Sequence, residues 1–315
     1  MKKTASLLLI LTIFILNNFF PPQSIKAATP YSISNVHSNY LGASLLDSDG
    51  SIWNWDSEEL TRVPELRDII QVKYGYGLKK DGTVWETSPH TYQIVGLENI
   101  ISIGSSIALK SDGTVWRFSN DTYPEKIDGL SDIVQISGGY ALKSDGTVWD
   151  IYHVTTEQSI TVPEQIQGFE NISMISGDNS MVVALKKDGT VQVLGKNYRG
   201  ELGRDPADFI DSDTKYEEAY EPVNIPTLSN VKAVYVASPN VGYALFALKE
   251  DGSLWSWGSH YNGALGIGDI GSSYTYIPTK ITGIPKVKQF DTIGTTSYII
   301  GEDGSLWTWD LTPAD

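Results

Sequence analysis

The chain of 315 residues contains no cysteine and carries a formal net charge of −15. The absence of cysteine excludes disulfide bonds, thiol chemistry and cysteine-ligated metal sites. The acidic charge argues against a nucleic-acid partner, because the field of the protein would repel a phosphate backbone. A hydrophobic content of 41% is enough for a sizeable core, and single all-β domains of this length are common.

The N-terminal residues have the pattern of a secretory signal peptide. Lys2 and Lys3 form a positive start, Leu7–Phe20 is an apolar run, and Ala27 supplies a small residue at the cleavage point. The apolar run is short for a membrane span, which needs about 20 residues. We therefore predict a bacterial-type signal peptide over residues 1–27, with cleavage after Ala27 or one residue later. The mature protein is then secreted and has no stable membrane insertion.

A nine-residue unit recurs along the rest of the chain. The stretch A-L-K-S-D-G-T-V-W occurs without change at Ala108–Trp116 and at Ala141–Trp149, and looser copies bring the number of such units, each with a central Asp-Gly pair, to seven. Apolar residues precede and follow each pair. Each copy therefore predicts a β-hairpin whose two-residue type I′ turn needs a glycine at positive φ. The glycines assigned to these structural turns are Gly50, Gly82, Gly113, Gly146, Gly189, Gly252 and Gly304.

Tryptophan marks fixed positions in this unit. It stands three residues after the glycine in six of the seven copies, and a second apolar residue usually follows two positions later. All nine tryptophans occupy these two positions, which share one face of a strand. Tryptophan is therefore expected to serve as repeated packing material rather than as one binding feature.

Each unit supplies four strands. An apolar strand such as Ile133–Ile136 precedes the hairpin, and a segment such as Tyr123–Ile127, with Pro and Ile, follows it. Seven units across residues 28–315 give a period of about 41 residues, which is typical of propeller blades. We predict a single all-β domain over these residues, a seven-bladed β-propeller of four-stranded antiparallel blades. Since the seventh unit ends before a fourth strand, Ala28–Ser34 is expected to close the ring as an N-terminal strand.

Units five and six carry a second signature after the hairpin. It reads G-K-N-Y-R-G-E-L-G at Gly195–Gly203 and G-S-H-Y-N-G-A-L-G at Gly258–Gly266. Together with A-L-K-x-D-G-x-x-W, it resembles the regulator of chromosome condensation repeat family, whose units end in W-G-x-N-x-x-G-x-L-G. The resemblance covers about residues 30–315 and implies a seven-bladed propeller. The chain departs from the family in lacking a His before the A-L-K strand, and the other units lack the G-x-L-G tail.

The resemblance also bears on function. The members that give the family its name exchange nucleotide on a small GTPase inside eukaryotic cells, a partner that an exported acidic chain would not meet. Secreted bacterial members that inhibit β-lactamases through one rim share the predicted compartment. The resemblance therefore implies a secreted bacterial propeller that binds a partner.

Three groups of residues could carry chemistry. The aspartates of the Asp-Gly pairs form a ring, but turn geometry alone places them there. The acidic insertion Arg204–Pro222 could bind calcium, but it lacks the EF-hand spacing, so a solvated loop is favoured. The four histidines fall in different units and belong to no catalytic motif. We therefore expect no catalytic residue, no metal site and no cofactor.

The remaining candidate is a rim of long loops. In an up-and-down blade the loop between the third and fourth strands lies on the same rim in every unit, so Gly195–Pro222 and Gly258–Pro278 should stand side by side. Long loops on a rigid scaffold often bind partners, and tyrosine suits protein interfaces. The alternative is that these side chains merely cover the propeller edge. The tyrosines assigned to partner binding are Tyr198, Tyr216, Tyr220, Tyr261, Tyr274 and Tyr276.

These observations predict a secreted, monomeric, non-catalytic scaffold that binds a protein or a cell-envelope component through one rim. Inhibition of the partner is one form that this function could take. The alternative is a secreted hydrolase or lyase that acts on carbohydrate, since propellers also host enzymes. A stable complex recovered from culture fluid would favour the scaffold. Loss of turnover after replacement of one histidine or carboxylate would favour the enzyme.

Overall fold

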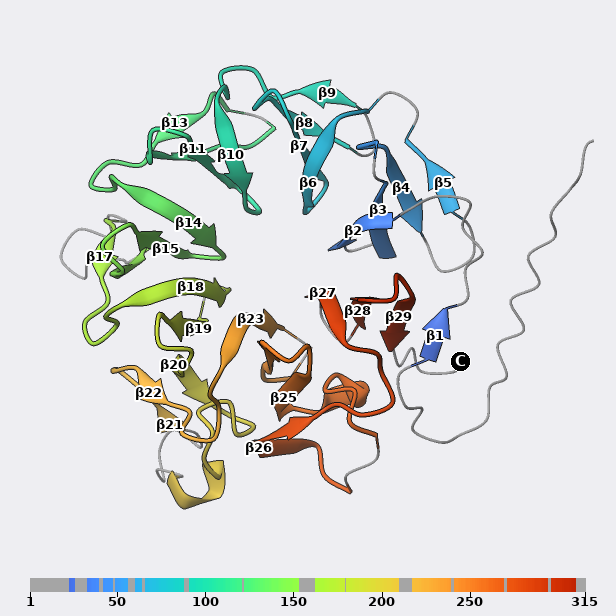
Figure 1. Cartoon of the computed structure of the whole chain (residues 1–315). Coiled ribbons are helices and arrows are strands. Elements are labelled where there is room, and N and C mark those ends of the chain that lie inside the picture. The colour runs from blue at the N-terminus through green and yellow to red at the C-terminus, as the bar shows by residue number, and fades with distance from the viewer. Residues whose placement is uncertain are drawn as a thin grey trace, which may run out of the picture.

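The structure is a computed structural model. It describes residues 23–25, 33–39, 42–47, 49–55, 60–63, 66–87, 91–120, 122–152, 162–178, 180–209, 217–238, 241–268, 271–293 and 296–309. Over these residues, antiparallel sheets stand like blades around a central axis (Figure 1). This arrangement is a β-propeller of four-stranded blades, and it confirms the predicted all-β fold.

Six blades are each built from strands that follow one another in the chain, and the first strand of each lies nearest the axis (Figure 1). The first three comprise β2 (Ile33–Asn39), β3 (Gly42–Asp47), β4 (Ile52–Trp55) and β5 (Leu60–Arg62); β6 (Ile69–Lys73), β7 (Tyr76–Lys79), β8 (Val84–Glu86) and β9 (Tyr92–Gln93); and β10 (Ile100–Ile103), β11 (Ile107–Lys110), β12 (Val115–Arg117) and β13 (Glu125–Lys126). The next three comprise β14 (Ile133–Ser137), β15 (Tyr140–Lys143), β16 (Val148–Asp150) and β17 (Glu164–Gln165); β18 (Ile172–Gly177), β19 (Met181–Lys186), β20 (Val191–Asn197), β21 (Glu217–Glu218) and β22 (Val223–Asn224); and β23 (Val231–Ala237), β24 (Ala244–Lys249), β25 (Leu254–Ser259) and β26 (Tyr274–Lys280). Two short 3-10 helices, η1 (Pro206–Phe209) and η2 (Tyr261–Gly263), lie in the loops that follow β20 and β25.

The last sheet joins the two ends of the described chain. It contains β27 (Val287–Ile293), β28 (Thr296–Gly301) and β29 (Leu306–Trp309), and its fourth strand is β1 (Gln23–Ile25). β1 pairs antiparallel with β29, so an N-terminal strand does complete this sheet.

The identity of the closing strand differs from the prediction. Ile33 and Ser34 already belong to β2, where Ile33 pairs with Asp47 of the first blade, so they are not available to the outer edge of the last sheet. Residues 28–32 lie outside the described residues. The strand beside β29 comes from further upstream, inside the predicted signal peptide.

The Asp-Gly turns have the predicted glycine conformation but a different turn type. All seven turn glycines have positive φ, for example 79° at Gly113. The Gly113 N–H donates to the Lys110 carbonyl, and the Lys110 N–H donates to the Thr114 carbonyl. Asp112 does not have positive φ. The loop therefore has three residues and ends in a glycine bulge, instead of the predicted two-residue type I′ turn.

A short chain of polar contacts supports five of these turns. In the third blade, Asp112 Oδ1 accepts a hydrogen bond of 2.6 Å from the Thr114 hydroxyl, and Trp116 Nε1 donates to the Thr114 oxygen at 3.0 Å. The Lys110 ammonium lies 3.9 Å from the centre of the Trp116 ring, which is a favourable cation–π geometry. Equivalent bonds recur in the turns at Asp81, Asp145, Asp251 and Asp303.

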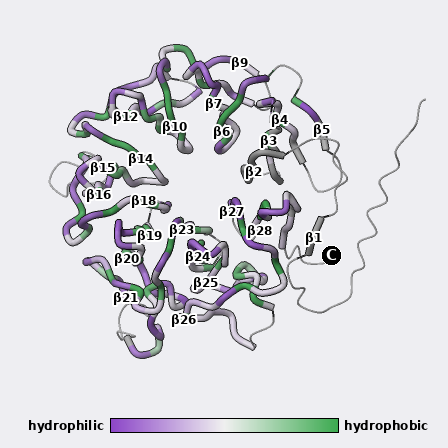
Figure 2. The backbone as a smooth tube through the Cα atoms, in the orientation of Figure 1, coloured by the Kyte–Doolittle hydropathy of each residue, from purple (hydrophilic) through white to green (hydrophobic). Residues whose placement is uncertain are grey.

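The core lies between the blades. The cluster at one junction contains Leu109 and Val115 of the third blade together with Ala141 and Ile151 of the fourth. Equivalent clusters lie at five further junctions. Figure 2 shows hydrophobic stretches in β10 and β14, whose residues contribute to these clusters. Seven tryptophans belong to or pack against these clusters, as predicted, and Trp257 is fully buried.

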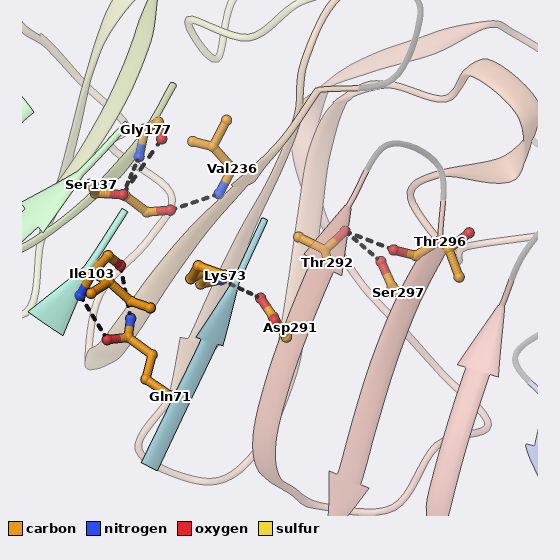
Figure 3. Close-up of polar contacts among 11 residues, drawn as sticks. Gln71, Lys73, Ile103, Ser137, Gly177, Val236, Asp291, Thr292, Thr296 and Ser297 are labelled. Atoms are coloured by element: carbon orange, nitrogen blue, oxygen red, sulfur yellow. Dashed lines mark hydrogen bonds and ion pairs between the residues drawn. The ribbon is translucent and has the colours of Figure 1, made fainter. Parts of the chain in front are cut away.

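Polar contacts join the innermost strands around the axis (Figure 3). Gln71 of β6 bonds both the N–H and the carbonyl of Ile103 in β10, and Gln135 does the same to Ile175 in β18. The Lys73 ammonium lies 3.6 Å from Asp291 of β27. This ion pair joins two sheets that are separated in the ring by the β2–β5 blade. Within the described part of the chain, no helix is both long and apolar enough to span a membrane.

Candidate functional site

Two blades extend beyond the others on one rim, which we call the loop rim. It carries the turns between first and second strands and the loops between third and fourth strands. β20 spans seven residues and β25 six, whereas β12 spans three. The added residues come from the G-x-x-x-x-G-x-L-G signatures. β20 continues into pairing with β21, and β25 continues until Ser259 pairs with Tyr274 of β26.

The loop after β20 is fixed by its own polar side chains. Arg204 forms an ion pair with Glu217, and its Nε donates to Glu217 Oε2 at 3.0 Å. The fully buried Asn197 donates its amide to Glu217 Oε2 at 3.1 Å and to the Arg204 carbonyl at 3.3 Å. These bonds hold the start and the end of the acidic insertion together, although residues 210–216 between them lie outside the described residues.

The loops after β20 and β25 contact each other, as the sequence predicted. Arg199 donates to the Ser273 hydroxyl at 2.5 Å, and the Tyr274 hydroxyl donates to Asp205 Oδ1 at 3.4 Å. A Cβ atom on Gly200 would lie 2.7 Å from the Tyr276 Cα, so glycine is required for this close approach. Burial, followed by the Asp205 charge, raises the pKa of Tyr274.

Glu201 anchors the first loop to the next blade. Its side chain is fully buried and accepts hydrogen bonds from the backbone N–H groups of Arg199 and Tyr243, at 2.6 and 3.0 Å. Its carbonyl accepts the indole N–H of Trp257 at 2.9 Å. Burial raises the pKa of the Glu201 carboxyl, and the two backbone donors act against that rise. The residue was missed as a structural anchor because its repeat position is variable: Ala264 stands there in the next unit.

The predicted tyrosines differ in exposure. Tyr198 and Tyr220 are exposed, at 41% and 84% of their surface, whereas Tyr261, Tyr274 and Tyr276 are half-buried. Tyr216 lies outside the described residues. The half-buried tyrosines help to cover the edge of the propeller, whereas Tyr198 and Tyr220 lie on its surface.

The other predicted groups take structural roles where they are described. Each turn aspartate accepts hydrogen bonds from the residue two positions ahead, and the hydroxyl of Thr114 lowers the pKa of Asp112 in this way. His260 is buried, with Nε2 2.9 Å from the Gly268 carbonyl oxygen. Among the described residues, no group of three His, Asp or Glu side chains is placed to hold a metal ion.

A pocket that the sequence did not predict lies on the same rim. It has a volume of about 550 Å³ and lies between the β10–β13 and β14–β17 blades. Its walls include Arg117, Asp150 and Tyr152, together with serine and threonine hydroxyls. Four separate turns contribute to it, so no local motif reveals it. The sequence does contain one indication of the pocket. The residue directly after the repeated tryptophan is Glu86, Arg117 and Asp150 in successive units, so its charge varies from blade to blade.

Comparisons with known proteins agree with this architecture. The sequence profile of the regulator of chromosome condensation (RCC1) repeat matches residues 251–292, from an Asp-Gly turn into β27. The RCC1 domain-containing protein RUG3, mitochondrial, of Arabidopsis thaliana is 28% identical over 153 residues, which are 48% of this chain and 32% of that protein. Probable E3 ubiquitin-protein ligase HERC3 of Homo sapiens is 26% identical over 158 residues, 50% of this chain and 14% of that protein. The chain thus spans about a third or less of the length of these relatives.

Solved structures show the same fold. Human WBSCR16 aligns with a TM-score of 0.64 at 16% identity, covering 89% of this chain and 86% of that chain. Prp20p of Saccharomyces cerevisiae, described together with its binding to Gsp1p and histones, aligns with a TM-score of 0.63 at 16% identity, covering 86% and 81%. Yeast RCC1 (Prp20) bound to Kap60 aligns with a TM-score of 0.61 at 19% identity, covering 77% and 70%. The chain therefore carries an RCC1-type repeat on an RCC1-like propeller.

Proposed function

We propose that this protein is an exported, non-catalytic scaffold that binds a protein or a cell-envelope component through the two loops after β20 and β25. We call the described parts of these loops, residues 195–209, 217–222, 258–268 and 271–278, the loop platform. As long as the edge of β29 is covered the scaffold acts as a monomer, and it has no nucleic-acid partner. Inhibition of the bound partner is one form of this activity.

The observation that carries the proposal is the combination of exposed tyrosines with fixed loops. Tyr198 stands directly beside Arg199, whose guanidinium bonds the neighbouring loop, and Tyr220 follows the β21 pairing. Loops that are already ordered lose little conformational freedom on binding. Exposed tyrosine rings on such loops supply large contact areas, which favour a protein interface.

Charge supports the choice of partner. Glu218 and Glu221 are exposed on either side of Tyr220, and the whole chain has a net charge of −15. Opposite charge accelerates encounter and suppresses unsuitable partners. The proposed partner therefore presents a basic surface around an apolar or aromatic centre.

The relatives are consistent with a scaffold. Prp20p is described with binding to Gsp1p and histones, and yeast RCC1 is found bound to Kap60. These partners belong to those proteins, and the proposal takes from them only that a propeller of this fold can bind proteins. We also infer a closed ring of seven blades, because seven Asp-Gly hairpins recur in the sequence and β1 supplies a fourth strand to the last sheet. Export follows from the signal-peptide pattern, and cleavage after Ala27 removes β1, so the closed ring belongs to the chain that still carries residues 23–25.

The test is recovery of a complex from culture fluid with purified protein and with matched tyrosine variants. A Tyr198→Ser, Tyr220→Ser double variant should keep the melting temperature and lose the partner. Tyr123→Ser is the control, because Tyr123 is 83% exposed but belongs to a different blade. Loss of the partner in the control but not in the double variant would place binding away from the loop platform.

A further inference from the structure

The pocket between the third and fourth blades has a composition unlike the loop platform. Its volume of about 550 Å³ lies in the range of small-molecule sites. Arg117 approaches from the third blade, and Asp150 and Tyr152 from the fourth. Ser105, Ser106, Ser119 and Thr122 add hydroxyl groups. The lining thus combines one charge of each sign and several hydroxyl groups with two aromatic residues, Tyr152 and the buried Phe118.

The two charged groups are held apart from each other. The Arg117 guanidinium lies 5.8 Å from the centre of the Tyr152 ring. Asp150 Oδ1 accepts the backbone N–H of Tyr152 at 2.8 Å, which fixes the carboxylate on its own loop. Among the described residues no ion pair joins Arg117 to Asp150. A donor and an acceptor of opposite charge therefore line the same pocket.

At the neighbouring junction, hydrogen-bonded side chains occupy the space that corresponds to this pocket. Between the second and third blades, Asn120 donates to Glu86 Oε1 at 2.9 Å and accepts the Tyr76 hydroxyl at 2.7 Å. The third blade has Arg117 at the repeat position of Glu86 and Ile107 at that of Tyr76. Ile107 offers no hydroxyl for such a plug. The hydroxyl that takes part in the hydrogen bonds at the neighbouring junction is therefore missing here.

We propose that this pocket binds a neutral saccharide unit. A sugar hydroxyl donates and accepts at once, so adjacent hydroxyls can donate to Asp150 and accept from Arg117. The apolar side of a sugar ring suits contact with the Tyr152 edge or face. An anionic ligand would be repelled by Asp150 and by the acidic charge of the chain, and a cationic ligand would be repelled by Arg117. An apolar ligand would leave both charged groups without hydrogen bonds, which is costly.

This proposal is independent of the loop platform, which belongs to the next two blades. Both sites open on the loop rim, since the pocket is formed by first–second turns and third–fourth loops. The saccharide could be free or part of a cell-envelope glycan. Probes with a free and with a blocked anomeric oxygen separate these two sources.

The experiment is titration calorimetry and saturation-transfer NMR on the purified full-length chain. The probes are N-acetylglucosamine, glucose and methyl glucoside as neutral sugars, with glucuronate and glucosamine as charged analogues and glycine as a zwitterion. We expect a neutral sugar to bind more tightly than both charged analogues. Preference for methyl glucoside over glucose indicates a glycan unit, and the reverse indicates a free sugar.

Variants locate the site. Arg117→Gln and Ser105→Trp, both at exposed positions, should weaken binding by at least about tenfold, the loss expected for one charge-assisted hydrogen bond or a blocked pocket. Asp150→Asn keeps an oxygen for the Tyr152 N–H and should also weaken binding. Lys80→Gln, exposed on the opposite rim, is the matched control. Equal melting temperatures show that each variant is folded.

Three results would overturn the proposal. One is the absence of binding by every neutral sugar at millimolar concentration. Another is unchanged affinity in both Arg117→Gln and Ser105→Trp. The third is binding of glycine alone, which would assign the opposite charges to a zwitterion instead of a saccharide.

Discussion

Removal of residues 1–27 should open the last sheet, because it removes β1. The strand makes three register pairs with β29, between Gln23 and Thr308, Ser24 and Trp307, and Ile25 and Leu306. Antiparallel pairing of this length involves about two to four hydrogen bonds, each worth about 0.5–1.5 kcal/mol. We therefore expect a loss of about 1–6 kcal/mol in the free energy of unfolding. For a chain of this size, the melting temperature should fall by roughly 2–24 °C.

The assay compares chains 23–315 and 28–315 by calorimetry and by size-exclusion chromatography with light scattering. The shorter chain should melt earlier and associate, since an unpaired edge strand invites pairing with other chains. Two point variants, Ser24→Pro and Ile25→Pro, separate pairing from chain length. Neighbouring N–H groups point to opposite sides of a strand, so one of the two should be clearly more destabilising. A monomeric 28–315 chain with an unchanged melting temperature would refute the closure by β1.

Three further outcomes follow from the structure. Gly50→Ala should lower the melting temperature of the protein more than Gly304→Ala. Both glycines have φ near +80°, but a Cβ at Gly50 would lie 2.7 Å from a backbone atom of the next blade, whereas a Cβ at Gly304 would meet nothing within 4 Å. Equal melting temperatures of the two variants would contradict this. The Thr147 hydroxyl lowers the pKa of Asp145 below its usual value of 3.8. The ionised Asp145 carboxylate therefore stabilises the fold above pH 3.8, and this stabilisation is lost as the pH falls through the folded-state pKa. Asp145→Asn should therefore flatten the acid limb of the melting-temperature profile. Glu201→Gln should lower the free energy of unfolding by about 1–3 kcal/mol, because one of the two backbone N–H groups that bond the carboxylate would face an amide N–H instead. The control is Glu218→Gln at an exposed position, and equal effects of the two substitutions would contradict the anchoring role of Glu201.

The repeating parts of the fold could be predicted because one residue pattern specifies each of them. The strand predicted at Ile133–Ile136 is β14, and the glycine of every Asp-Gly pair has positive φ. The turn type was wrong because a two-residue turn and a three-residue turn with a bulge both place glycine at positive φ. Only the hydrogen bonds, such as Gly113 N–H to the Lys110 carbonyl, distinguish the two.

Features that join distant parts of the chain were harder to predict. Gln23–Ile25 is too short to show strand periodicity, and its partner is almost the whole chain away. Arg117 and Asp150 come together only because consecutive blades pack side by side. The neighbouring positions of the two long loops were predictable, since blade topology alone determines them. The exposure of each tyrosine was not, because contacts such as Tyr274 with Asp205 depend on side-chain packing.

The two rims of the propeller differ in how freely their residues can change. On the Asp-Gly rim, a Cβ at Gly113 would lie 3.0 Å from the Cα of Asp132 in the following blade, and the aspartate, hydroxyl and tryptophan of the turn are bonded in series. A substitution there disturbs both the hairpin and the junction. On the loop rim, the position after the tryptophan carries Glu86, Arg117 and Asp150 in successive units, while the strands before it keep the same register. The loop rim can therefore acquire new chemistry at little cost to the ring, which is the physical reason to seek both the partner and the saccharide on that side.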